Sequence, residues 1–148
     1  MDYRLSRRAA TLSPSLTLTI DTRAKQLAAA GEDVVGFGVG EPDFPTPPHI
    51  VAAAVKALED GFTRYTAASG ILELRKAIAD KMLREQKVAY DPTQITVSCG
   101  GKHACFNVVL ALCQQGDEVI IPSPYWLSYP EMVKLAGATP VILETTDE

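Results

Sequence analysis

The sequence predicts an α/β fold in which parallel strands alternate with covering helices. Apolar residues with helical spacing recur along the 148-residue chain, and short apolar segments lie between them. Residues 95–121 follow the order strand, helix, strand over about 30 residues, the length expected of a βαβ unit. Such a unit implies a parallel pair joined by a right-handed crossover. With 47% hydrophobic and 22% charged residues, the chain also has an ordinary globular composition.

The N-terminal half of the chain predicts three helices and one short strand, separated by irregular segments. The first helix is expected to end at Gly31, because glycine readily adopts the left-handed conformation that closes a helix. Four prolines in residues 40–48 remove backbone donors, so this segment is predicted to be a rigid loop. The expected helices span residues 16–30, 50–58 and 74–86, and the expected strand spans residues 34–37.

The C-terminal half predicts strands over residues 95–98, 118–121 and 139–143, with helices over residues 101–113 and 128–135. The helix over residues 101–113 is apolar on nearly every face and is therefore expected to be buried. Parallel sheets need helices on both faces, and so few strands leave an incomplete sheet with an exposed edge. We therefore expect the chain to be the front portion of a longer protein, and to fold weakly or aggregate by itself.

Charge and composition exclude several classes of partner. A net charge of −4 argues against nucleic acid and anionic membranes, and the cluster Arg4, Arg7 and Arg8 lies in an N-terminal arm expected to be mobile. No apolar run approaches the roughly 20 residues of a membrane span, and the N-terminus has no apolar signal segment, which predicts a cytoplasmic protein. The three cysteines form no CxxC pair, so we expect them to be reduced and buried, with no metal site. They are Cys99, Cys105 and Cys113.

The segment Ser98-Cys99-Gly100-Gly101-Lys102 is the strongest candidate site for a ligand. Its two glycines lie between a predicted strand end and a predicted helix start, which is where open α/β sheets bind ligands. Backbone N–H groups at a helix N-terminus lack intrahelical acceptors, and the helix dipole is positive there, so the geometry favours a phosphate. The alternative from the residues alone is a tight turn that needs glycine only for its dihedral angles.

Two better-known phosphate patterns do not fit the sequence. A P-loop requires glycine where Thr96 stands and serine or threonine where His103 stands. Residues 36–41 resemble a dinucleotide-binding fingerprint, but the third glycine comes one residue early and prolines follow in place of a helix. Nucleoside triphosphates and nicotinamide cofactors are therefore disfavoured as ligands.

Six spaced pieces of sequence, taken together and in this order, resemble one known family. They are Leu5-Ser6-Arg7-Arg8 with Pro14-Ser15; Gly40-Glu41-Pro42-Asp43-Phe44; Tyr65 with Gly70 and Leu74-Arg75; Gly100-Gly101-Lys102; Gly116-Asp117-Glu118-Val119; and Pro122-Ser123-Pro124-Tyr125-Trp126 with Tyr129-Pro130. The pattern resembles the aminotransferases of the pyridoxal-phosphate fold-type I superfamily, and most closely the bacterial-type aspartate aminotransferases.

The resemblance implies a fold and a domain division. The complete fold would be a three-layer αβα transferase of fold type I, of which this chain supplies an incomplete N-terminal portion. Residues 1–47 would form the N-terminal arm and part of the small domain. Residues 48–148 would form the first part of the large, cofactor-binding domain.

The resemblance also implies a cofactor, pyridoxal 5′-phosphate, and residues that contact it. The amides of Gly100, Gly101 and Lys102 would hold its phosphate, and Trp126 would stack on its pyridine ring. Tyr65 matches a tyrosine that reaches the cofactor phosphate of the partner subunit, so a homodimer with shared active sites is implied. From the residues alone, Trp126 in the core and Tyr65 in surface packing stay open as alternatives.

On the substrate side, the resemblance places Gly40 and Trp126 at the substrate, with Lys102, Ser15 and Thr17 near its distal carboxylate. A solvated lysine is the alternative for Lys102, and His103 is expected to have a structural role. The resemblance places the Schiff-base lysine beyond Glu148, so no catalytic residue is expected among these 148.

The implied reaction is amino transfer from an aspartate-like amino acid to a 2-oxo acid. Aspartate, glutamate, prephenate and aromatic substrates all stay open. Two other functions also stay open. One is β-elimination or carbon-sulfur lyase chemistry with the same cofactor, and the other is a stand-alone phosphate-binding module.

Overall fold

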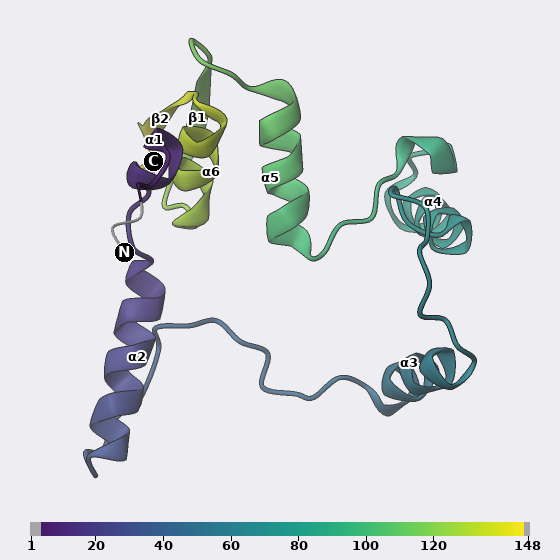
Figure 1. The fold of residues 1–148 in the computed structure, drawn as a ribbon, viewed down its shortest axis with the longest axis horizontal. Coiled ribbons are helices and arrows are strands. Elements are labelled where there is room, and N and C mark those ends of the chain that lie inside the picture. The colour runs from purple at the N-terminus through teal and green to yellow at the C-terminus, as the bar shows by residue number, and fades with distance from the viewer. Residues whose placement is uncertain (1–3, 147–148) are drawn as a thin grey trace. The chain divides into compact units, whose positions relative to one another are not determined.

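The computed structural model describes residues 4–146, and its elements are shown in chain order in Figure 1. The chain divides into two compact units, one formed by Met1–Glu41 with Cys105–Glu148 and the other by Pro42–Ala104. We describe each unit by itself. The domain boundary expected between residues 47 and 48 stays a prediction.

The first unit is built on a parallel pair of strands. Strand β1 (Glu118–Ser123) pairs with β2 (Thr139–Glu144), in a register that runs from Glu118 opposite Thr139 to Ser123 opposite Glu144. Helix α6 (Ser128–Ala136) connects the two strands and packs against both. The predicted strands at residues 118–121 and 139–143 and the helix at 128–135 are therefore confirmed.

A small apolar cluster joins α6 to the strand pair. Its buried members are Ile121, Val133 and Ala138, and Val133 is only 1% exposed. Burial of apolar side chains is the main source of stability for such a unit. The partly buried residues that pack against the cluster are Val109, Cys113, Val119 and Tyr125.

The four longer predicted helices are all present, with ends close to the expected ones. They are α2 (Leu16–Ala29), α3 (Pro48–Glu59), α4 (Leu72–Gln86) and α5 (Gly101–Leu112). Gly31 and Gly61 follow α2 and α3 with φ angles of 91° and 77°, the left-handed conformation expected after a helix end. None of the helices within residues 4–146 is long and apolar enough to cross a membrane.

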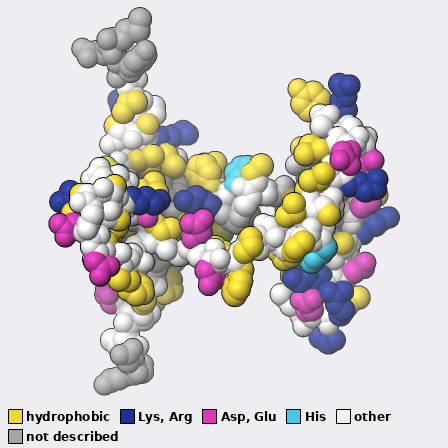
Figure 2. Space-filling view, turned by 90° about the horizontal axis from the view of Figure 1, so that it is seen from below, with side chains coloured by type: hydrophobic (Ala, Val, Ile, Leu, Met, Phe, Trp, Pro, Cys, Tyr) yellow, Lys and Arg dark blue, Asp and Glu magenta, His cyan; other side chains and the backbone are white. Residues whose placement is uncertain are grey.

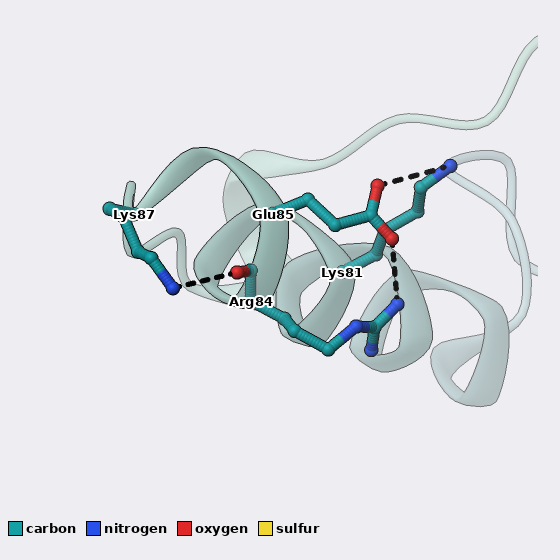
Figure 3. Close-up of polar contacts among 4 residues, drawn as sticks. All are labelled: Lys81, Arg84, Glu85 and Lys87. Atoms are coloured by element: carbon teal, nitrogen blue, oxygen red, sulfur yellow. Dashed lines mark hydrogen bonds and ion pairs between the residues drawn. The ribbon is translucent and has the colours of Figure 1, made fainter.

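The C-terminal end of α4 carries a small group of polar contacts (Figure 3). Arg84 Nη2 lies 2.9 Å from Glu85 Oε1, and Lys81 Nζ lies 3.7 Å from Glu85 Oε2. The Lys87 ammonium donates to the Arg84 carbonyl at 2.9 Å, and Lys87 closes the helix with a left-handed φ of 62°. These side chains are exposed, so they form a solvated helix end rather than part of a core.

Two of the predicted strands do not form, because a strand exists only when a neighbour completes its hydrogen-bond ladder. Residues 34–37 have no such ladder in their unit, and Phe37 is 94% exposed. Residues 95–98 are partly extended but make one backbone bond to a segment distant in sequence, from Val97 N–H to the Ser69 carbonyl at 3.0 Å. The predicted βαβ unit over residues 95–121 is therefore wrong, and the parallel pair is joined through α6 instead.

The predicted burial of α5 and of the cysteines is also wrong. Cys99 and Cys105 are exposed and Cys113 is half-buried, although all three are free thiols as predicted. Val108 and Leu112 on α5 are exposed as well, because only one side of the helix meets the cluster around Val133. Figure 2 shows that hydrophobic side chains are widely exposed on the surface of the chain.

The N-terminal arm, expected to be mobile, contains a short helix, α1 (Arg7–Ala10), that packs against α6. Ser6 caps this helix by accepting a hydrogen bond from the Ala9 N–H at 3.2 Å. The Ser13 N–H donates to Glu131 Oε2 on α6 at 3.1 Å. The arm is therefore held by a carboxylate that the sequence pattern did not single out.

Glu131 gives the arm a pH-dependent attachment. The Lys134 ammonium, at 2.8 Å, lowers the pKa of Glu131 below its usual value, and the Ser13 N–H adds to this effect. A carboxyl whose folded pKa is depressed stabilises the fold above its unfolded pKa of about 4.3. That stabilisation is lost as the pH falls through the lower folded pKa.

Substituting Glu131→Gln in the full-length protein should therefore weaken the attachment of the arm at neutral pH. Hydrogen exchange of the peptide that contains Ser13, corrected for intrinsic rates, should show lower protection in the variant and little dependence on pH. The wild type should lose protection only below about pH 4. Glu32→Gln, the same change at an exposed carboxylate of the same unit, serves as the control. Equal protection in Glu131→Gln and wild type at neutral pH would contradict the assignment.

Candidate functional site

The glycine pair forms the turn that leads into α5. Gly100 has a left-handed φ of 92°, and its carbonyl accepts the bond from Ala104 N–H at 3.1 Å that begins the helical pattern. The Gly101 N–H has no acceptor among the described residues, as expected in the first turn of a helix. The predicted position of the anion site, at the N-terminus of an α-helix, therefore has the required backbone arrangement.

The Gly100 N–H, which is one of the donors predicted for this site, already makes a hydrogen bond within the chain. The Gly100 N–H donates to the Ser98 carbonyl at 2.8 Å, so in this conformation it is directed to the chain. The role of Gly100 here is conformational, since its positive φ disfavours other residues. The predicted contact of the Gly100 amide with a phosphate stays a prediction.

The space beside the two glycines is open. A Cβ atom placed on Gly100 or on Gly101 would meet no atom within 4 Å. Nothing in the fold itself therefore requires Gly101, which has no positive φ, to lack a side chain. An open cradle at a helix N-terminus fits a ligand whose oxygens approach the main chain closely.

His103 stabilises the loop before the helix. Its Nδ1 atom accepts a hydrogen bond from the Cys99 N–H at 3.3 Å. The side chain thus connects the first turn of α5 back to the residue before the glycine pair. This contact agrees with the structural role predicted for His103. Lys102 is exposed in the same first turn of the helix.

The segment before the glycine pair lies against a second loop of the same unit. Val97 donates to the Ser69 carbonyl, and a Cβ atom on Gly70 would lie 2.8 Å from the Val97 side chain. Gly70 also has a φ of 94°. Only glycine therefore allows residues 69–70 to approach residue 97 this closely.

Tyr65 belongs to the same unit and precedes this loop. Its side chain is fully exposed, at 107% of the reference area. No described residue of its own unit covers the ring, and the contact of Tyr65 with a partner subunit's cofactor stays a prediction.

Trp126 lies in the first unit, in the turn between β1 and α6. Its ring meets that of Tyr129 edge to face, with centroids 5.4 Å apart and planes at 89°. The turn is closed by the Tyr129 N–H, which donates to the Trp126 carbonyl at 3.0 Å. Trp126 is 44% exposed and so is not a core residue, which leaves part of its ring available for a ligand.

The remaining predicted substrate residues also lie in the first unit. Ser15 caps α2, since its Oγ atom accepts from the Leu18 N–H at 3.4 Å, and its hydroxyl proton is left to donate elsewhere. Thr17 is half-buried in the first turn of the same helix. A Cβ atom on Gly40 would meet no atom within 4 Å, so the backbone there is open to a ligand.

The predicted site residues are thus divided between the two compact units. Gly100, Gly101, Lys102 and Tyr65 lie in the unit of residues 42–104. Trp126, Ser15, Thr17 and Gly40 lie in the other. Within residues 4–146, no group of three or more His, Cys, Asp and Glu side chains is arranged to hold a metal ion.

Most of the lysines lie on polar helix faces, as the sequence indicated. Lys25, Lys56, Lys81 and Lys134 each pair with a carboxylate three or four residues away on the same helix. The Asp21 carboxylate, which accepts a hydrogen bond from Lys25, raises the pKa of that lysine. Lys25 is therefore not a candidate nucleophile, since an activated lysine requires a depressed pKa.

One residue in the same unit as the glycine pair has a role that sequence reasoning missed. Arg75 appears in the sequence only as part of the spaced pattern Gly70, Leu74-Arg75. In the structure its guanidinium donates to two backbone carbonyls, those of Gly70 and Pro92. Backbone acceptors leave no signal in the sequence, so only the spacing from Gly70 indicated this residue.

Comparison with known proteins was made at the level of sequence and of structure. Residues 32–148 match the sequence model of the family described as aminotransferase class I and II. The chain is 50% identical over 145 residues to the aspartate aminotransferase of Bacillus subtilis. It is 53% identical over 137 residues to the aspartate/prephenate aminotransferase of Cereibacter sphaeroides.

Solved structures show the same relationship. The aspartate aminotransferase of Thermus thermophilus, determined with maleate, matches 98% of the chain with a TM-score of 0.92 and 46% identity. An alanine aminotransferase from Pyrococcus furiosus matches 97% of it with a TM-score of 0.90 and 31% identity. The chain spans 37% of the length of the Bacillus relative, 34% of the Cereibacter relative and 38% of the Thermus structure.

Because Gly70 lies so close to Val97, we expect a single methyl group added at residue 70 to lower the free energy of unfolding strongly. Gly70→Ala adds a Cβ atom at 2.8 Å from Val97 and imposes a positive φ on alanine, so it should destabilise the full-length protein by about 2–4 kcal/mol. Gly61→Ala, at a φ of 77° with open space, should cost only about 1 kcal/mol. Denaturant unfolding measures both. Equal costs would show that the contact with Val97 is not tight.

Proposed function

Because the chain belongs to the class I and II aminotransferase family, we propose that the full-length protein transfers an amino group from an aspartate-like amino acid to a 2-oxo acid. The chain has the predicted α/β fold, that of the N-terminal part of the fold-type I transferases. The observation that carries the proposal is the open glycine cradle at the N-terminus of α5, on a chain 50% identical to an aspartate aminotransferase.

Pyridoxal 5′-phosphate fits the residues that are present. Its phosphate is an anion of the size that a helix N-terminus and two residues without Cβ atoms accommodate. Gly101 offers an N–H without an acceptor, and Gly100 and Gly101 leave the approach open. When bound, the cofactor supplies the electron sink for the reaction at the amino acid. Gly100 and Gly101 would hold and orient the phosphate of the cofactor.

Two aromatic residues complete the proposed cofactor site. Trp126 would present its partly exposed ring to the pyridine ring, braced from its edge by Tyr129. Tyr65, which no described part of the chain covers, would donate its hydroxyl to the phosphate bound by a partner subunit. The full exposure of Tyr65 supports a homodimer with shared active sites.

The proposed substrate is a dicarboxylic amino acid. Lys102 supplies a cation in the first turn of α5, and the Ser15 hydroxyl retains a proton that can be donated to a carboxylate. Thr17 follows Ser15 in α2, and the open main chain at Gly40 would lie near the substrate. The Thermus relative was determined with maleate, a dicarboxylate, which supports this substrate class.

Three free thiols support a reducing, cytoplasmic location.

The proposed reaction can be tested directly on the full-length protein. Aspartate and 2-oxoglutarate should give glutamate and oxaloacetate, measured by coupling oxaloacetate to NADH oxidation. Alanine should react with a kcat/KM at least about tenfold lower, because a charge-assisted contact to the distal carboxylate is absent. A parallel assay supplies cysteine, whose Cβ carries a sulfur leaving group. Release of sulfide, ammonia and pyruvate from cysteine, with no amino transfer from aspartate, would replace the proposal with β-elimination.

The glycine cradle predicts a loss of cofactor uptake without a loss of folding. Gly101→Val in the full-length protein adds a side chain whose Cβ atom would meet no atom within 4 Å, and this side chain would occupy the space proposed for the phosphate. Uptake, measured by visible absorbance after addition of pyridoxal 5′-phosphate, should fall at least about a hundredfold in affinity. Gly36→Val, at another open glycine without a positive φ, should bind normally. Normal uptake by Gly101→Val would place the phosphate site elsewhere.

A further inference from the structure

We infer that Arg75 is a positioning residue. It fixes the Tyr65 loop (residues 65–70) relative to the segment of residues 92–99, which leads into the glycine cradle formed by Gly100 and Gly101. The inference rests on the proposed function, since it concerns how that cofactor site is held in shape. All the residues involved lie within the compact unit of residues 42–104.

The guanidinium of Arg75 connects two backbone segments that are distant in sequence. Its Nε atom donates to the Gly70 carbonyl at 3.2 Å, and its Nη1 atom donates to the Pro92 carbonyl at 2.9 Å. Arginine has a planar group with several donors in fixed directions, so it can hold two carbonyls at a set separation. Arg75 is half-buried, which makes these charge-assisted bonds stronger than they would be in water.

The first of these carbonyls belongs to the loop that carries Tyr65. The Gly70 N–H donates to the Ala67 carbonyl at 2.9 Å, which closes the turn that follows Tyr65. The Tyr65 ring is fully exposed, so no side-chain packing within the described chain fixes its position. Its placement therefore depends on the backbone of this loop, which Arg75 holds at Gly70.

The second carbonyl begins the segment that leads to the cradle. Pro92 starts the short 3-10 helix η1 (Pro92–Gln94), against which α4 packs, and its carbonyl also accepts the Ile95 N–H at 3.4 Å. Residues 95–99 then run directly to Gly100. The Val97 N–H donates to the Ser69 carbonyl and so joins this segment to the Tyr65 loop, and the two bonds from Arg75 form a further polar link between them.

The Arg75 guanidinium donates to backbone carbonyls rather than to a carboxylate side chain. Among the described residues, no carboxylate lies within ion-pair distance of its guanidinium. Thr93 bonds lower the pKa of Asp91, and the charge of Arg75 adds to that effect through space. The two carbonyl bonds are thus its principal polar contacts, which is what a role in positioning backbone requires.

The experiment uses full-length Arg75→Met and Arg75→Lys, with Arg84→Met as a matched control. The Arg84→Met substitution removes the same charge from the same helix, α4, but at the solvated C-terminal end of that helix (Figure 3). The dissociation constant of pyridoxal 5′-phosphate is measured by absorbance titration, and the melting temperature of the cofactor-free protein is measured alongside. We expect Arg75→Met to weaken binding at least about tenfold and Arg84→Met to change it less than about twofold. Arg75→Lys should lie between them, because an ammonium cannot hold both carbonyls in the same geometry.

A double-mutant cycle with Tyr65→Phe separates positioning from general stabilisation. If Arg75 acts by placing the Tyr65 loop, the loss caused by Arg75→Met should be smaller when Tyr65 is already phenylalanine. A purely structural role would lower the melting temperature and leave the two effects on binding multiplicative, which would overturn the inference. If Arg75→Met fails to fold, the same cycle with Arg75→Lys decides the question.

The outcomes also distinguish this inference from the proposed function. A wild-type protein that takes up no pyridoxal 5′-phosphate would overturn both. A wild type that binds the cofactor, with Arg75→Met and Arg75→Lys binding as tightly, would overturn the positioning role alone and leave the proposed function intact.

Discussion

The close contact between Gly70 and Val97 is the constraint on which the unit of residues 42–104 depends. A side chain at Gly70 would occupy the space of Val97, and the neighbouring Ser69 carbonyl takes the single backbone bond from Val97. Because residues 95–98 lack a full ladder, this approach and the two bonds from Arg75 determine where the chain enters the turn at Gly100. The proposed anion site is thus positioned by backbone contacts between two loops.

In the other unit the limiting factor is the amount of apolar surface that the elements can bury. The parallel pair of β1 and β2 with α6 encloses only a small cluster around Val133, and most large apolar side chains of the chain stay exposed. Isolated two-stranded pairs have little stability of their own. Specific contacts at the edge of this unit, such as that of Glu131 with Ser13, therefore matter more than they would beside a large core.

Local features of the fold could be predicted from the sequence, and features that need a distant partner could not. The helices were predicted because their apolar spacing and closing glycines, such as Gly31 and Gly61, lie within each segment. The strands at residues 34–37 and 95–98 were not correct, because alternation of residues does not reveal whether a neighbour completes the ladder. In the site, the glycine turn into α5 was predicted from two residues. The engagement of the Gly100 N–H and the two carbonyl acceptors of Arg75 are main-chain contacts that no side-chain pattern encodes.

A cradle made of main-chain groups explains how recognition is divided in the proposed enzyme. Backbone N–H groups at a helix N-terminus donate to any phosphate of suitable size, so the cradle proposed at Gly101 would give affinity for an anion with little selectivity. Selectivity for one phosphate has to come from side chains such as Trp126 and Tyr65, whose rings are exposed and available to a ligand or a partner. Those side chains lie on loops whose positions are set by other contacts, Tyr129 for Trp126 and Arg75 for the Tyr65 loop. In the proposed enzyme, the residues that position these loops would therefore contribute to selectivity through the side chains that they place.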